Sequence, residues 1–232
     1  MWNSARIPEP ISSLIHRRVS LPHAATLSLD SALPPVYLSF VRAAFKEWAV
    51  IVDALGSGQQ IIILRKGGIS EGRGGFKPEH SQFFLFPTLF HQQRDSVLPA
   101  AQERLDQIAP GFPPPDRIRI EFFAEVELVK QLHSLVEAEA LRGQHVWRDE
   151  VIAERFDWGR EKAIFVFAVR VFRLPRVVEL PMLPTYAGCK SWIELGREIP
   201  TEGSRPVLSD SCFNEKLGLL RRVLDGRTSV VP

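Results

Sequence analysis

The chain has 232 residues, of which 45% are hydrophobic, and its formal net charge is +2 at pH 7. This length and composition allow a sizeable core, and the small net charge argues against a uniformly polycationic protein. Cys189 and Cys212 have no paired-ligand spacing, so neither a zinc site nor a disulfide framework is expected. No apolar stretch reaches the ~18 to 20 residues of a transmembrane helix, and we expect a soluble, cytoplasmic protein without membrane contact.

The N-terminal part of the chain is expected to lead from an extension into regular structure. Residues 1–35 are rich in Ser, Pro and Arg and predict a poorly ordered extension, with an organelle targeting segment as the alternative. Helical spacing of apolar residues predicts a short helix over residues 36–45. Two β-rich runs, residues 48–55 and 60–65, flank a Gly-Ser-Gly connection and predict a β-hairpin.

A glycine-rich loop that carries Lys66, Arg73 and Lys77 is expected after this hairpin. Its glycines tolerate many backbone conformations, so the loop should be flexible. It leads to a strand over residues 82–86, which Pro87 should end because proline has no backbone N–H to donate.

The rest of the chain shows clear helical or strand periodicity. In chain order we expect a helix over residues 97–108, a strand over 117–129, a helix over 131–142, a central strand over 163–174 and a helix ending at 224. Residues 110–115 are rich in proline and predict a stiff connection. Ser209 or Asp210 is a suitable N-cap for the last helix.

These elements predict an α+β fold with a mixed or antiparallel curved sheet, open or barrel-like, and helices at its ends. We expect a single domain over residues 36–199, with the internal proline-rich connection near 110–115. Residues 200–232 should form a C-terminal tail with one helix.

Site-like residues concentrate in residues 45–91, where polar groups stand at the ends of probable strands. Four of them carry acid-base or cationic chemistry and are the candidate catalytic residues: Glu47, Lys66, His80 and His91. A histidine beside an apolar strand is, however, more often structural than catalytic. The sequence fits neither the metal-binding pattern of restriction nucleases nor a nucleotide P-loop, so no metal site is predicted and no cofactor is indicated.

Basic and aromatic residues in the same regions suit nucleic-acid binding, because cations attract phosphates and flat rings stack on bases. The candidates for contact with DNA or RNA are Lys46, Arg65, Lys66, Arg73, Lys77, Arg170, Arg173 and Trp192. The alternative is that the cations solvate strand ends and the aromatic rings pack in the core.

Four strings carry a family resemblance: Phe-Lys-Glu-Trp-Ala-Val-Ile-Val (45–52), Leu-Arg-Lys-Gly-Gly-Ile (64–69), Glu-His-Ser-Gln-Phe-Phe-Leu-Phe-Pro-Thr (79–88) and Pro-Thr-Tyr-Ala-Gly-Cys-Lys-Ser-Trp (184–192). With them the chain resembles an uncharacterised bacterial family, domain of unknown function 1802, from about residue 45 to residue 195. The family has no established activity. Some members are joined to a restriction-endonuclease-type domain, which implies a link to nucleic acid or defence and a nuclease partner.

The residues and the resemblance together favour a nucleic-acid-associated binding module. The first alternative is an enzyme that acts on nucleotides or nucleic acid, with His80 and His91 as acid-base groups. The second alternative is a protein-interaction domain. The sequence indicates no oligomeric state.

Overall fold

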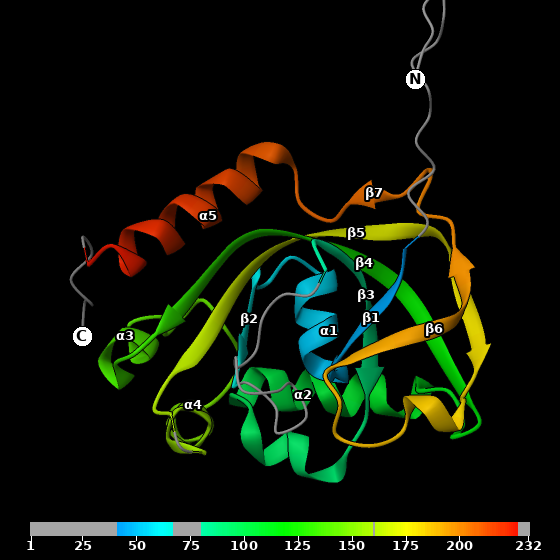
Figure 1. Ribbon diagram of the computed structural model, residues 1–232, viewed down its shortest axis with the longest axis horizontal. Helices are drawn as coiled ribbons and strands as arrows, with labels where there is room; N and C mark the ends of the chain where they lie inside the picture. The colour runs from blue at the N-terminus through cyan, green and yellow to red at the C-terminus, as the bar shows by residue number, and fades with distance from the viewer. Residues whose placement is uncertain (1–40, 67–79, 160, 227–232) are drawn as a thin grey trace, which may run out of the picture. The chain divides into compact units, whose positions relative to one another are not determined.

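The computed structural model describes residues 41–66, 80–159 and 161–226, with only the backbone of His91 and Gln92 (Figure 1). In chain order, with η for a 3-10 helix, the elements are β1 (Val41–Trp48), α1 (Ala49–Gly56), β2 (Ile62–Arg65), β3 (Gln82–Thr88), η1 (His91–Ser96), α2 (Pro99–Ile108), η2 (Ala109–Gly111), β4 (Arg117–Leu132), α3 (Leu135–Glu139), α4 (Asp149–Asp157), β5 (Ile164–Pro181), η3 (Pro184–Tyr186), β6 (Trp192–Ile199), β7 (Arg205–Pro206) and α5 (Asp210–Leu224). The extension predicted over residues 1–35 lies outside the described residues. None of the helices in the described ranges is long and apolar enough to cross a membrane.

One mixed, seven-stranded sheet organises the fold and confirms the predicted α+β class. Its strand order is β2-β5-β4-β3-β1-β6, and β7 pairs with β5 outside this path. The pairing of β1 with β3 is parallel, and the other pairs are antiparallel. The sheet is therefore open, with β2 and β6 at the two ends of the path.

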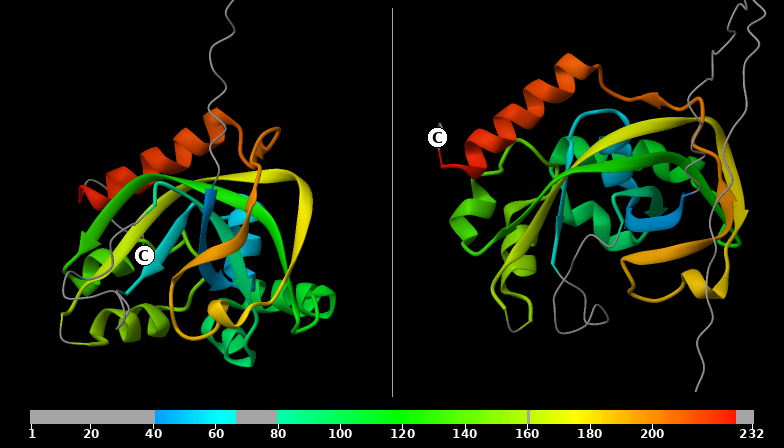
Figure 2. Two further views of the ribbon diagram at one scale, coloured as in Figure 1. Left: turned by 45° about the vertical axis from the view of Figure 1, so that its right-hand side comes forward. Right: turned by 45° about the horizontal axis from the view of Figure 1, so that its top comes forward.

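The curvature of the sheet comes mainly from its two longest strands. β4 and β5 pair from Arg117↔Pro181 to Leu132↔Ile164, with register shifts between Ile120 and Phe122 and between Val126 and Leu128. Such irregularities bend a strand and increase its twist. β4 and β5 consequently arch over α1, while α5 lies on the outer side of the arch (Figures 1 and 2).

The hairpin predicted from residues 48–55 and 60–65 is wrong, because residues 49–56 form helix α1. Valine and isoleucine favour strands locally, but the surroundings of a segment can override this preference. The arch surrounds α1, and nearly the whole helix is buried. A helix satisfies its own backbone groups, which suits a segment enclosed by side chains. The second run is a strand, β2, which pairs with β5.

The helix predicted over residues 36–45 is also wrong where the structure describes it, because residues 41–48 form β1. This strand lies between β3 and β6, and every second residue from Val41 to Glu47 is buried. On its other face Arg42 is exposed but Ala44 is buried, so the sequence has no clear alternation of polar and apolar residues. Its apolar residues then fit a helical spacing by coincidence.

Most of the later elements confirm the predictions, including α2, β4, β5 and α5. Ser209 caps α5 by accepting a hydrogen bond from the N–H of Cys212 at 3.3 Å. Several boundaries differ from the predictions, and β5 continues to Pro181 instead of ending at 174. β3 continues through Pro87 to Thr88, and the helix expected over residues 131–142 is only α3, since β4 extends to Leu132.

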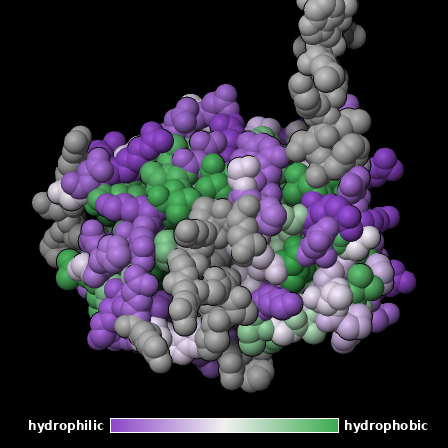
Figure 3. All heavy atoms as spheres, viewed as in Figure 1, coloured by the Kyte–Doolittle hydropathy of each residue, from purple (hydrophilic) through white to green (hydrophobic). Residues whose placement is uncertain are grey.

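The core fills the space between the arch, α1 and α2. Its largest fully buried side chains include Trp147, Phe45, Phe83, Phe84 and Phe86. On the face shown in Figure 3, hydrophilic residues cover most of the described surface, with smaller hydrophobic areas between them. This distribution is ordinary for a folded domain, so the surface alone does not mark a site.

Candidate functional site

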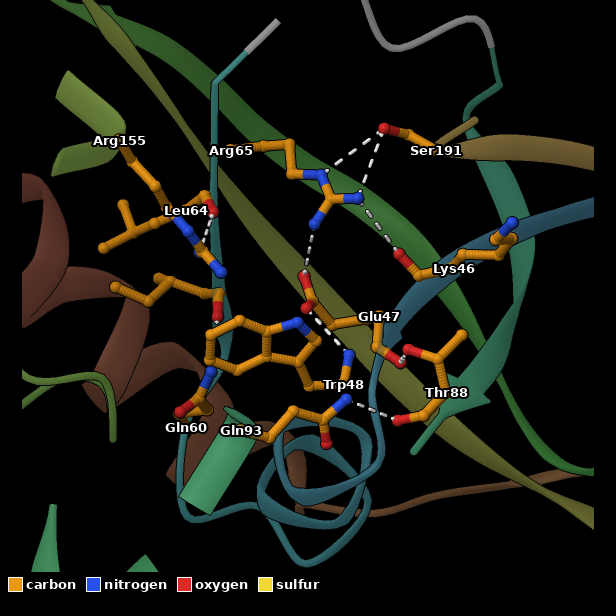
Figure 4. Close-up of polar contacts among 11 residues, drawn as sticks. Lys46, Glu47, Trp48, Gln60, Leu64, Arg65, Thr88, Gln93, Arg155 and Ser191 are labelled. Carbon is orange, nitrogen blue, oxygen red and sulfur yellow. Dashed lines mark hydrogen bonds and ion pairs between the residues drawn. The ribbon is translucent and has the colours of Figure 1, made fainter. Parts of the chain in front are cut away.

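β2 and β6, the two ends of the sheet, are linked by a side-chain contact between Arg65 and Ser191. Arg65, the last residue of β2, points toward β1 and toward Ser191, which directly precedes β6 (Figure 4). Its Nη2 lies 3.4 Å from the carbonyl oxygen of Lys46 and 3.3 Å from Oγ of Ser191, and its Nη1 lies 3.6 Å from Oε2 of Glu47. Lys46, Glu47, Arg65 and Ser191 are called the seam cluster below.

Glu47 is the buried acid of the seam cluster, and 0% of its side chain is exposed. Oε1 accepts a hydrogen bond from the backbone N–H of Trp48 at 2.8 Å. Oε2 has no hydrogen-bond partner among the described residues and faces the guanidinium of Arg65. A buried carboxylate needs a nearby positive charge, so Arg65 stabilises Glu47 and Glu47 in turn positions Arg65.

The end of β1 is also fixed from the side of β3 (Figure 4). The hydroxyl of Thr88 donates a hydrogen bond to the carbonyl oxygen of Glu47 at 3.0 Å. The side-chain amide of Gln93 donates to the carbonyl oxygen of Thr88 at 2.8 Å. Glu47 is therefore held by its backbone as well as by its carboxylate.

A second guanidinium, from Arg155 of α4, lies near Glu47. It donates a hydrogen bond to the carbonyl oxygen of Leu64 at 2.9 Å. Its central carbon lies 4.9 Å from the ring centre of Trp48 and 5.0 Å from that of Trp147. Burial lowers the pKa of Arg155 to about 10, against the opposing effect of the Glu47 carboxylate. Arg155 therefore remains positively charged at neutral pH.

Lys46 adds a third cation and fixes the segment that leads into β6. Its Nζ donates hydrogen bonds to the carbonyl oxygens of Tyr186 at 2.8 Å and Gly188 at 2.6 Å. Burial lowers the pKa of Lys46, and the positive charges of Arg65 and Lys190 act in the same direction. Several cations thus lie close to one another in this part of the molecule.

Aromatic side chains continue from the seam cluster. Trp192 of β6 lies opposite Phe45 of β1, and their ring centres are 4.8 Å apart. The ring of His80 lies 5.3 Å from that of Trp192, and the guanidinium carbon of Arg65 lies 5.2 Å from the ring centre of Phe45. His80 is exposed and Trp192 is partly exposed. Cationic and aromatic groups therefore form one continuous set.

The other catalytic candidates do not join this set. Lys66 turns toward α4, where its Nζ donates to the carbonyl oxygens of Phe156 and Glu161. His91 begins η1, beyond the opposite end of β3 from His80, and its side chain lies outside the described residues. Within residues 41–66 and 80–159, no hydrogen bond or ion pair joins any two of Glu47, Lys66 and His80.

The remaining nucleic-acid candidates are separated as well. Arg170 forms an ion pair with Asp210 at the start of α5. Arg173 lies over the ring of Phe122 at 4.6 Å and 3.5 Å from Oε2 of Glu121. Arg73 and Lys77 lie outside the described residues. Of the predicted binding set, the structure brings together Lys46, Arg65 and Trp192.

Comparisons with known proteins identify the family. A family model described as "Domain of unknown function (DUF1802)" matches residues 44–218. The chain belongs to this family. The matched range of the DUF1802 domain contains the whole seam cluster, His80 and Trp192. A search of curated proteins finds no significant match.

The DUF1802 domain is also similar to crystal structures of ASCH from Zymomonas mobilis. One has 13% sequence identity and a TM-score of 0.39, and the match covers 77% of this chain and 94% of that chain. A serine-to-alanine variant has 10% identity and a TM-score of 0.38, covering 76% and 94%. A tyrosine-to-phenylalanine variant has 13% identity and a TM-score of 0.37, covering 76% and 96%.

Sequence reasoning missed two residues of the candidate site, Ser191 and Arg155. Ser191 lies within the family string of residues 184–192, so the resemblance was a signal that could have found it. Arg155 belongs to a charged helix that looks like an ordinary solvated face. Its role depends on the packing of α4 against Trp48, which no local pattern reveals.

In the described part of the DUF1802 domain, no three His, Cys, Asp or Glu side chains gather in an arrangement that could hold a metal ion. Glu47 is the nearest acid to the cations of the seam cluster, and its two oxygens are turned toward the Trp48 N–H and Arg65. The arrangement is suited to holding an anion at Arg65 rather than to binding a cation.

Proposed function

We propose that this DUF1802 domain is a nucleic-acid-binding module whose contact surface is the seam cluster together with His80 and Trp192. The observation that carries the proposal is the position of Arg65. Its guanidinium lies over Phe45, which packs against Trp192, and Trp192 in turn packs against His80. Cations attract phosphate groups and flat rings stack on unpaired bases, so the set suits single-stranded DNA or RNA.

The charge around Glu47 supports an anionic ligand. Arg65 and Arg155 both lie near this single carboxylate, so positive charge is in excess. Arg65 is also available for contact, because 21% of its side chain is exposed. Its polar contacts are 3.3 to 3.6 Å long, which is longer than a strong hydrogen bond. A phosphate oxygen can therefore compete with them.

The acid-base alternative has less support. Glu47 is buried beside Arg65, Lys66 binds carbonyl oxygens, and His80 packs against Trp192. A general acid or base has to reach the proton that it transfers, together with a partner group. The link to restriction-type nucleases that the family resemblance implies fits a binding module, which would deliver such a partner to DNA or RNA. Arg73 and Lys77 belong to the proposed cationic set on the evidence of the sequence alone.

Changing Lys190 and His80 together to alanine is expected to weaken binding of a single-stranded oligonucleotide about tenfold. His80 belongs to the proposed surface and Lys190 borders it; both residues are exposed, so the fold should be retained. The loss of one phosphate contact should also make the slope of log affinity against log salt shallower by about 0.7. Fluorescence anisotropy of a labelled oligonucleotide over a series of salt concentrations measures both quantities.

The matched control is Arg222→Ala, which removes one exposed positive charge from α5. This variant should bind the oligonucleotide with nearly unchanged affinity and slope. Equal losses in the control and the double variant would indicate a general charge effect, and unchanged binding by the double variant would remove Lys190 and His80 from the interface.

A further inference from the structure

A cavity of about 410 Å³ lies between α1, α2 and the sheet and shares no lining residue with the seam cluster. One face of α1, formed by Ala49, Val52, Asp53 and Gly56, makes one wall. Residues of α2, η2, β3, β4 and β5 make the others. This volume falls within the range of about 300 to 1,000 Å³ that small-molecule sites occupy.

Part of the lining of this cavity is apolar and comes from Leu85, Pro87, Phe112 and Phe122. The ring of Phe112 is only partly buried and offers a flat aromatic surface. The ring of Phe122 lies close to α1, because a Cβ added to Gly56 would meet its Cζ at 2.3 Å. Glycine at this position therefore lets the ring fit against the helix. An apolar, ring-shaped group is the natural complement of such a wall.

Three arginines line the same cavity, and their ion pairs differ in length. Arg104 is engaged by Asp53 through two hydrogen bonds of 2.8 Å. Arg119 and Arg173 have looser ion pairs, at 3.4 Å to Glu179 and 3.5 Å to Glu121. Their side chains are 36% and 57% exposed. Exposed ion pairs of this length contribute little stability, so both guanidinium groups can turn to an anion.

The local irregularity of the sheet brings one of these cations to the aromatic wall. The register between β4 and β5 shifts between Ile120 and Phe122, and Phe122 then pairs with Arg173. The guanidinium carbon of Arg173 lies 4.6 Å from the ring centre of Phe122. Bulges often redirect side chains next to binding sites. Here the shift places a cation directly beside an apolar surface.

We propose that this cavity binds a small anionic ligand with a flat ring system, the chemistry of a nucleoside monophosphate. The base packs against the partly exposed ring of Phe112, and the phosphate is bound by Arg119 and Arg173, whose planar guanidinium groups match phosphate oxygens. Asp53 engages Arg104, whereas Arg119 and Arg173 have only long, exposed ion pairs, so these two guanidinium groups favour an anionic ligand. This site is independent of the proposed nucleic-acid surface.

The probe is AMP, titrated into the full chain by isothermal calorimetry, with adenosine and inorganic phosphate as the two partial ligands. We expect AMP to bind at least tenfold more tightly than either, because each lacks one half of the recognised chemistry. The variant Arg119→Gln with Arg173→Gln should lose at least tenfold in AMP affinity while its weak binding of adenosine is unchanged. Each single variant is measured too, so the result does not depend on the folding of the double variant.

Arg197→Gln is the matched control, since Arg197 is exposed on β6 and does not line the cavity. It should bind AMP as the unaltered chain does, as should the Lys190→Ala, His80→Ala variant. The proposal is overturned if AMP does not bind at millimolar concentration, if adenosine binds as tightly as AMP, or if the Arg119 and Arg173 variants bind AMP normally.

Discussion

Replacing Arg65 by alanine is expected to lower the free energy of unfolding by about 3 kcal/mol, the loss that follows when a buried charge is left without its partner. The Glu47 side chain is 0% exposed, and its Oε2 has the Arg65 guanidinium as its ion-pair partner. We expect the lower end of the usual range because Arg155 supplies further positive charge nearby. Urea denaturation followed by tryptophan fluorescence measures the change.

The companion variant combines Arg65→Met with Glu47→Gln. A glutamine can still accept the hydrogen bond from the Trp48 N–H at Oε1, and the buried negative charge that needs Arg65 is gone. Removal of both members of a buried pair is often close to neutral, but Arg155 loses the opposing charge of Glu47, so this double variant should recover part of the lost stability. If Arg65→Ala were as stable as the unaltered chain, Arg65 would not be the group that compensates Glu47.

Lowering the pH from about 6.5 to about 4 is expected to destabilise the fold through His145. Burial lowers the pKa of His145 to about 4, against the opposing effect of Asp149. The unfolded chain takes up this proton near the ordinary pKa of about 6.5, whereas the folded chain does not. Protonation therefore favours the unfolded state in this interval, and the loss reaches about 3 kcal/mol below pH 4.

The measurement compares the pH dependence of unfolding for the unaltered chain and for His145→Gln. The variant starts from a lower stability but should show a flatter profile between pH 6.5 and 4. His133→Gln is the control, since His133 is exposed and its replacement should leave the profile unchanged. Parallel profiles for His145→Gln and the unaltered chain would show that His145 gains its proton equally in both states.

The fold was predictable where the periodicity of the sequence is long or a cap marks an end. β4 alternates over many residues, and α5 has both a Ser209 cap and a regular apolar face, so both were found. The segment of residues 41–56 was misread because apolar, buried residues occur on both faces of it: five of the eight residues of β1 and seven of the eight residues of α1 are buried. Such burial weakens the contrast between faces that distinguishes a helix from a strand.

The candidate site was predictable as a set of residue types but not as a set of neighbours. Lys46, Arg65 and Trp192 come from three separate strands, and only the curl of the sheet and the pairing of β1 with β6 bring them together. Arg170 and Arg173 were nominated on the same chemical grounds. The side chain of Arg170 instead contacts Asp210, and that of Arg173 contacts Phe122. The direction of a side chain depends on tertiary packing, which cannot be deduced from a local sequence pattern.

The most direct test of the proposed function follows the tryptophan indole N–H resonances by NMR while a single-stranded oligonucleotide is added. Trp192 belongs to the proposed surface, whereas Trp147 is only 1% exposed in the core and serves as an internal reference. A Trp192→Phe variant assigns the resonance. We predict that the Trp192 signal shifts to saturation as the oligonucleotide binds while the Trp147 signal stays in place. An unmoved Trp192 signal at saturating oligonucleotide would contradict the account.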